Sequence, residues 1–151
     1  MIGGTLRALL REKLRGGPCR VLGPSLKIEV VGRIRYPDAF VNCTPAGPSD
    51  QLIRDPVVVF EVVSPSTSHI GRIAKLREYQ ATDSIQHYVI LELDGVAATV
   101  FARESGLWTA RALTAGDRLA MPEIGVELLL DDIYADADLP AEESDDEAPK
   151  Q

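Results

Sequence analysis

The run Val-Val-Val-Phe-Glu-Val-Val at residues 57–63 constrains the fold more than any other feature of the sequence. It is too short for a core helix and rich in β-branched residues, which is typical of a central strand covered on both faces. Because side chains alternate along a strand, Glu61 shares a face with Val57, Val59 and Val63. A buried carboxylate is costly unless it is paired, so Glu61 is expected to contact a metal ion or a base, or to lie at a solvent opening. From position alone, a structural salt bridge explains Glu61 as well as a functional site does.

Helices and further strands are predicted on both sides of this run. An apolar stripe predicts an amphipathic helix over residues 5–15; it consists of Leu6, Leu9, Leu10 and Leu14. A second helix is predicted over residues 69–81. Alternating or apolar segments predict strands over 26–30, 33–43, 87–93, 97–102, 107–113 and 126–130, with a loop over 44–55. This order of elements predicts an α/β fold with a mixed sheet and few helices.

The charge of the chain is concentrated at its carboxyl end. The 151 residues are about the size of one domain and carry a net charge of −7. Nine acidic residues and one basic residue follow position 130, so residues 1–130 have a net charge of +1. We therefore predict one domain over residues 1–138 and a disordered acidic tail over 139–151. A nearly neutral body neither favours nor excludes nucleic acid as a partner.

Composition also bears on the compartment. A membrane-spanning helix needs about 20 apolar residues, and no stretch of this sequence approaches that length. The basic opening segment does not resemble a secretory leader. The two cysteines, Cys19 and Cys43, exclude a disulfide scaffold and a four-cysteine zinc site. We expect a cytoplasmic protein in a reducing environment, without a membrane segment; the sequence is compatible with a homodimer but does not specify an oligomeric state.

Asp38 and Lys75 are the other two candidate site residues. Asp38 follows Pro37 at the beginning of an apolar strand, where an Asp is more often a turn or cap residue. Together with Glu61 on a neighbouring strand, however, it can hold a divalent cation with waters, as Mg²⁺ is usually bound. Lys75 lies on the helix that follows the Glu61 strand, so it can reach that carboxylate, although most helix lysines are simply solvated.

Four stretches together resemble the Uma-type endonuclease family of the PD-(D/E)XK superfamily: residues 35–38, 55–67, 75–79 and 85–90. The most specific part is the run Glu-Val-Val-Ser-Pro-Ser-Thr at 61–67 with Lys75 and Tyr79 downstream at this spacing. The resemblance covers about residues 5–135. It implies a restriction-endonuclease-like mixed β-sheet flanked by helices, with additional C-terminal antiparallel strands.

The same resemblance implies a chemistry. It implies that Asp38 and Glu61 bind Mg²⁺ or Mn²⁺, and that Asp38, Glu61 and Lys75 are catalytic. The superfamily usually has its lysine two residues after the glutamate, where this sequence has Val63, whereas the Uma-type pattern has it on the following helix, where Lys75 matches. The implied reaction is hydrolysis of DNA phosphodiester bonds, with the lysine stabilising charge or orienting water.

Two departures from the family pattern keep a second hypothesis open. Family members usually have an aspartate four residues before the lysine, where this sequence has Gly71. They also usually carry an acidic segment and a hairpin before the first helix, at which this sequence begins. The alternative function is a catalytically degenerate module that keeps the nuclease fold and acts in binding or assembly.

Overall fold

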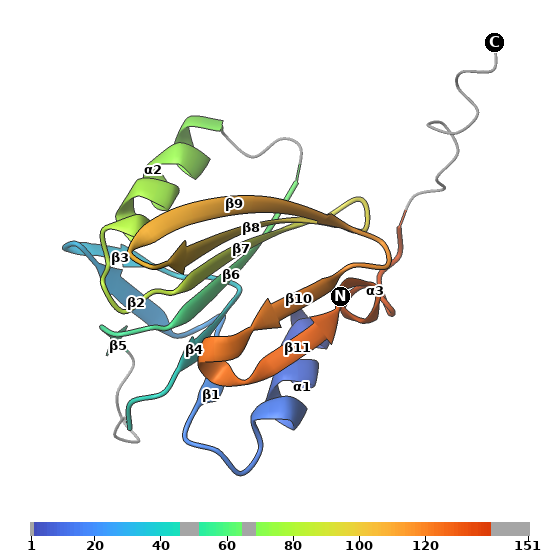
Figure 1. The fold of residues 1–151 in the computed structure, drawn as a ribbon, viewed down its shortest axis with the longest axis horizontal. Coiled ribbons are helices and arrows are strands. Elements are labelled where there is room, and N and C mark those ends of the chain that lie inside the picture. Colours follow the sequence, from blue (N-terminus) through green and yellow to red (C-terminus); the bar gives the residue numbers. More distant parts are fainter. Residues whose placement is uncertain (1, 46–51, 65–68, 140–151) are drawn as a thin grey trace.

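A six-stranded mixed sheet forms the centre of the computed structural model, which describes residues 2–45, 52–64 and 69–139 (Figure 1). Within these residues the strand order is β1-β4-β6-β7-β8-β9, with β6 and β7 parallel and the other neighbours antiparallel. The strands are β1 (Arg20–Leu22), β4 (Ala39–Asn42), β6 (Val58–Val63), β7 (His87–Glu92), β8 (Ala97–Glu104) and β9 (Leu107–Thr114). The predicted mixed α/β fold is confirmed, and the predicted strand 57–63 is the interior strand β6.

Two small sheets accompany the large one. One has the order β3-β2-β5, from β3 (Arg33–Arg35), β2 (Lys27–Val30) and β5 (Leu52–Ile53). The other is the antiparallel pair β10 (Arg118–Met121) and β11 (Val126–Leu129), joined by the short helix η1 (Pro122–Ile124). The additional C-terminal antiparallel strands are therefore present, and the short helix α3 (Leu130–Ile133) follows them.

The structure corrects the sequence prediction at three places in these strands. The predicted strand 33–43 is two strands in different sheets, β3 and β4, separated at Pro37, which has no N–H to donate to a ladder. The predicted loop 44–55 contains β5, which pairs with β2. Strand β10 was not predicted from the sequence; its four residues pair with β11.

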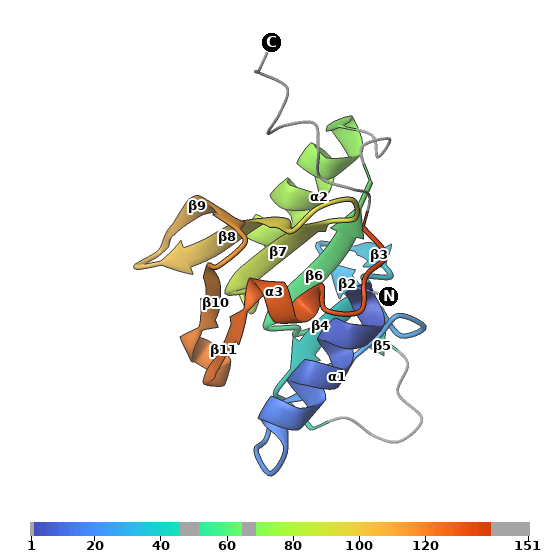
Figure 2. The ribbon, with the colours of Figure 1, turned by 90° about the vertical axis from the view of Figure 1, so that its right-hand side faces the viewer.

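Helices α1 (Ile2–Leu14) and α2 (His69–Gln80) cover opposite faces of the central sheet (Figure 2). On the face of the sheet that α1 covers, Leu6 and Leu10 are fully buried in one core with Phe60. On the face that α2 covers, Tyr79 is fully buried in a second core with Val59 and Val63. Side chains of β6 alternate between the two faces of the sheet and contribute to both cores, as the sequence predicted.

Val57 does not lie on the face of the sheet that the sequence predicted for it. Val57 was expected to share the face of Glu61, but it packs against the core on the α1 side. Strand β6 begins only at Val58, so the period of two does not extend back to Val57.

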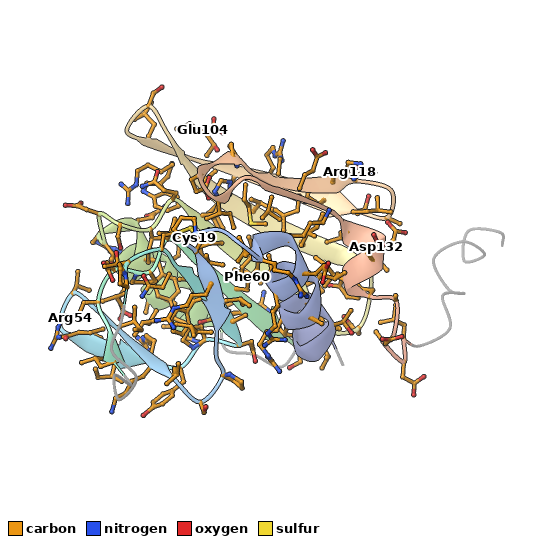
Figure 3. The ribbon with its side chains drawn as sticks, turned by 90° about the horizontal axis from the view of Figure 1, so that it is seen from below. Cys19, Arg54, Phe60, Glu104, Arg118 and Asp132 are labelled. Atoms are coloured by element: carbon orange, nitrogen blue, oxygen red, sulfur yellow. A yellow bond between two sulfur atoms is a disulfide. The ribbon has the colours of Figure 1, made fainter. Side chains whose placement is uncertain are left out.

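The two cysteines form a disulfide between Cys19 and Cys43. These residues flank the first pair of the β1–β4 ladder, Arg20 with Asn42, so the bond ties the edge strand β1 to β4. This pairing differs from the reduced state expected from the cysteine count. Figure 3 shows Cys19 beside the core.

The remaining sequence predictions concern segments at the edge of the described chain. Of the predicted tail 139–151, the described residue Leu139 is half-buried against the core on the α1 side, and residues 140–151 lie outside the described part. Residues 65–68, which include the end of the family-like run at 61–67, also lie outside it. No helix among the described residues is long and apolar enough to cross a membrane.

Candidate active site

Glu61 is a buried carboxylate that accepts hydrogen bonds on both of its oxygens. It lies on β6 facing α2, and only 6% of the residue is exposed. Its Oε1 accepts from Lys75 Nζ at 3.0 Å and from the Tyr88 hydroxyl at 3.3 Å. Its Oε2 accepts from the Tyr79 hydroxyl at 3.0 Å. The charge of Glu61 is therefore compensated by one cation and two neutral donors, which offsets the cost of burying it.

Lys75 and Tyr79 reach Glu61 from the same face of α2. They are four residues apart, so one helical turn aligns them over β6. The Lys75 side chain is 34% exposed, whereas Tyr79 is fully buried. Lys75 thus contacts Glu61 from the solvent-exposed side of the site, and Tyr79 contacts Glu61 from the buried side.

The two tyrosines are fixed as hydrogen-bond donors. Burial raises the pKa of Tyr79 and of Tyr88 far above the ordinary value for a phenol, and the nearby negative charge of Glu61 raises both further. The two rings also contact each other edge to face, with centroids 4.6 Å apart. Both hydroxyls therefore keep their protons at neutral pH, and both donate to Glu61.

Removing either tyrosine hydroxyl should destabilise the protein, and the loss should be larger for the hydroxyl with the shorter hydrogen bond to Glu61. Tyr79→Phe is expected to lower the free energy of unfolding by about 1.5–3 kcal/mol, the usual range for a hydrogen bond to a charged group. Tyr88→Phe should cost less, because its bond to Glu61 is longer. Urea denaturation measures both values, and an equal or reversed order would contradict the described roles.

Asp38 immediately precedes β4, the strand that pairs with the Glu61 strand β6. The β4–β6 register ends with Ala39 opposite Phe60, so the next position places Asp38 opposite Glu61. Asp38 Oδ2 accepts a hydrogen bond from the backbone amide of Val62 at 2.8 Å. The structure therefore brings Asp38, Glu61 and Lys75 to one region, next to the carboxyl end of β6.

The backbone of Asp38 is held by residues that the sequence prediction did not identify. Arg7 of α1 donates from its guanidinium to the carbonyl oxygen of Asp38 at 2.9 Å. Gly23 packs directly on the same peptide; a Cβ there would lie 3.0 Å from the Asp38 oxygen, and Gly23 has a φ of +115°. Any larger residue at position 23 would strain the backbone and displace Asp38.

Arg35 and Glu78 join the small sheet to α2 beside the site. The Arg35 guanidinium donates two hydrogen bonds to Glu78, at 2.8 and 2.7 Å, in a bidentate arrangement. The bond to Arg35 lowers the pKa of Glu78 below its ordinary value. Because Glu78 precedes Tyr79 on α2, this pair fixes the helix that carries Lys75 and Tyr79.

The stabilisation from this pair should depend on pH. The pKa of Glu78 is lower in the folded than in the unfolded state, so the pair stabilises the fold above the unfolded value of about 4.3. That contribution is lost as the pH falls through the folded pKa. Glu78→Gln should therefore be less stable than the parent at neutral pH, and the difference should vanish in acid. Glu12→Gln, which removes a fully solvated pair with Arg15, should show no such difference at any pH.

The carboxylates fit a hard divalent cation better than a transition-metal site. Among the described residues there is no group of three or more His, Cys, Asp or Glu side chains that could hold a metal ion. Mg²⁺, however, is commonly bound by one or two carboxylates, with waters and substrate phosphate as the other ligands. Asp38 and Glu61 supply that donor set, and Glu61 Oε2 accepts from one donor among the described residues, which leaves it a lone pair.

Tyr88, Arg7 and the Arg35–Glu78 pair are the contributions that sequence reasoning missed. Tyr88 lies in the family-like stretch 85–90, and its position in an apolar strand could have identified it as a buried hydroxyl that needs a partner. The contact of Arg7 with Asp38 spans 31 residues, and that of Arg35 with Glu78 spans 43. No local pattern signals contacts of that range.

Comparisons with known proteins agree with this fold. The model of the Uma2 family, described as "Putative restriction endonuclease", matches residues 2–131. The Synechocystis protein slr1290, described as uncharacterized, is 33% identical over 138 residues, which are 89% of this chain and 73% of that protein. The crystal structure of a "putative nuclease belonging to DUF820" from Anabaena variabilis matches with a TM-score of 0.73 and 13% identity, over 89% of this chain and 78% of that one. At that identity the structural likeness concerns the fold.

Proposed function

Because this chain belongs to the Uma2 family, we propose that it is a Mg²⁺-dependent endonuclease that hydrolyses phosphodiester bonds in DNA. The observation that carries the proposal is the buried Glu61 with Lys75 Nζ at 3.0 Å and Asp38 immediately before the neighbouring strand β4. A buried ion pair is rarely more stable than apolar residues of the same size. The Glu61–Lys75 pair on this central strand, with the Asp38 carboxylate near it, is therefore better explained by a catalytic role than by a contribution to the stability of the fold.

Each residue has a distinct part in this proposal. Asp38 and Glu61 would hold Mg²⁺, which when bound polarises a phosphate and lowers the pKa of a coordinated water. Lys75 donates one of its three N–H bonds to Glu61, so the others can reach a phosphate oxygen or a water from the exposed side. Tyr79 and Tyr88 fix the orientation of the Glu61 carboxylate.

A cleavage assay on supercoiled plasmid DNA tests the proposal. We expect nicked or linear product with Mg²⁺ or Mn²⁺, and none with EDTA. The matched control is the double variant Asp38→Ala/Glu61→Ala, purified in the same way, which should give no product. Product that forms in EDTA, or with the double variant, would show that the cleavage does not come from this site.

One observation favours the second candidate, a degenerate module that acts in binding or assembly. The usual family aspartate is replaced by Gly71 on α2, so the site has two carboxylates rather than three. Calorimetric titration with Mg²⁺ separates the two functions. Binding that disappears in Asp38→Ala/Glu61→Ala favours the nuclease, whereas DNA binding without any Mg²⁺ binding favours the degenerate module.

The cytoplasmic location remains a prediction from the sequence, which is compatible with a homodimer without specifying one. Light scattering after size-exclusion chromatography would measure the oligomeric state directly.

A further inference from the structure

Three arginines form a row along one flank of α1. Arg7 and Arg11 are spaced by four residues on α1, beside the buried leucine stripe, and Arg15 follows four residues later in the turn that ends the helix. The first of them, Arg7, donates to the backbone carbonyl oxygen of Asp38 at 2.9 Å, from the face of the sheet opposite to Glu61 and α2. From there the row runs along the helix, and Arg11 and Arg15 are exposed.

The far end of the row opens into a hollow of about 360 Å³. Arg20, an exposed residue at the start of β1, lines the hollow from the side opposite α1. The full lining is Arg11, Leu14, Arg15, Cys19, Arg20 and Val21. Three arginines therefore line one hollow, and the disulfide at Cys19 lies at the end of the adjacent strand pair.

The dimensions of the row match a nucleic-acid backbone. The eight-residue step from Arg7 to Arg15 rises about 12 Å along the helix. One DNA strand advances about 3.4 Å per nucleotide, so this length corresponds to between three and four nucleotides. Guanidinium groups bind phosphate in a bidentate way and are less strongly hydrated than ammonium groups.

We propose that Arg11, Arg15 and Arg20 bind the phosphate backbone of substrate DNA to one side of the bond cut near Asp38. The inference rests on the proposed function, because the substrate is the DNA that the site would cleave. The Glu12 carboxylate contacts Arg15 at 2.8 Å, but more than 70% of both side chains is exposed. Such a pair contributes little free energy, so a phosphate can displace Glu12.

Basic residues near a helix C-terminus also stabilise the helix dipole, and this is the competing explanation. It accounts for Arg11 and for Lys13 equally. It does not account for Arg20, which lies on β1 and faces the same hollow. The two explanations differ in what they predict for DNA binding.

The test is the salt dependence of binding to a short DNA duplex, measured by fluorescence anisotropy in EDTA so that no cleavage occurs. Each phosphate contact contributes about 0.9 to the slope of log K against log salt. The triple variant Arg11→Gln/Arg15→Gln/Arg20→Gln should therefore lower that slope by about 2.7. The variant with Lys at the same three positions should keep most of the slope.

A matched triple variant, Lys13→Gln/Arg111→Gln/Arg118→Gln, removes the same charge from exposed positions outside the row. It should leave the slope nearly unchanged, and circular dichroism should show that all variants fold. If both triple variants lower the slope equally, the row has no special role and this inference fails while the nuclease proposal stands. If the parent chain does not bind DNA at all, both proposals fail.

Discussion

Glu61→Gln is expected to lower metal-dependent DNA cleavage by at least about 1,000-fold. The substitution keeps the size of the side chain and an oxygen that can accept from Tyr79, but it removes the charge that would hold the cation in the proposed mechanism. A metal ion stabilises the transition state by several kcal/mol, and each loss of about 1.4 kcal/mol lowers the rate tenfold. The measurement is the initial rate of plasmid nicking at saturating Mg²⁺.

A second glutamate provides the control for this result. Glu29 on β2 also pairs with a base, Arg54, but its side chain is 32% exposed and it belongs to the small sheet. Glu29→Gln should leave the cleavage rate within about twofold of the parent, since surface substitutions have small effects. If Glu61→Gln cleaves as fast as Glu29→Gln, Glu61 is not part of the active site.

Phe60→Ala should produce the largest loss of stability. Phe60 is fully buried on the face of β6 opposite Glu61, in the core that α1 covers (Figure 3). Removing a buried phenyl group loses its transfer free energy and leaves a cavity, at a cost of about 3–5 kcal/mol. The free energy of unfolding from urea denaturation measures this loss.

The control for Phe60 is an apolar residue in solvent. Leu107 at the start of β9 is 71% exposed, so Leu107→Ala should change the free energy of unfolding by no more than about 0.5 kcal/mol. A loss below about 1 kcal/mol for Phe60→Ala would mean that α1 does not pack on β6 as described.

The elements with a strong local pattern could be predicted from the sequence. The leucine stripe determines α1, and the alternation within residues 58–63 determines both cores and the inward direction of Glu61. Because α2 follows β6 after a short connection, Lys75 also falls within reach of Glu61. These predictions succeeded because periodicity and chain order are local properties that the sequence records directly.

The elements that depend on a partner could not be predicted. Strand β10 is extended because β11 pairs with it, and the segment 33–43 divides because its two halves belong to different sheets. The Cys19–Cys43 bond likewise depends on the antiparallel pairing of β1 with β4. In each case the conformation follows from a contact with a distant part of the chain.

The candidate site also has features that the sequence predicted and features that only the tertiary structure decided. The residue types and their order along the chain were sufficient to select Asp38, Glu61 and Lys75 as candidates. Only the tertiary structure decided how they are held: Tyr88 donates to Glu61 from the next strand, and Arg7 reaches Asp38 from a helix on the other face of the sheet. Hydrogen bonds of this kind depend on distances of about 3 Å between residues far apart in sequence, and only the packed fold sets such distances.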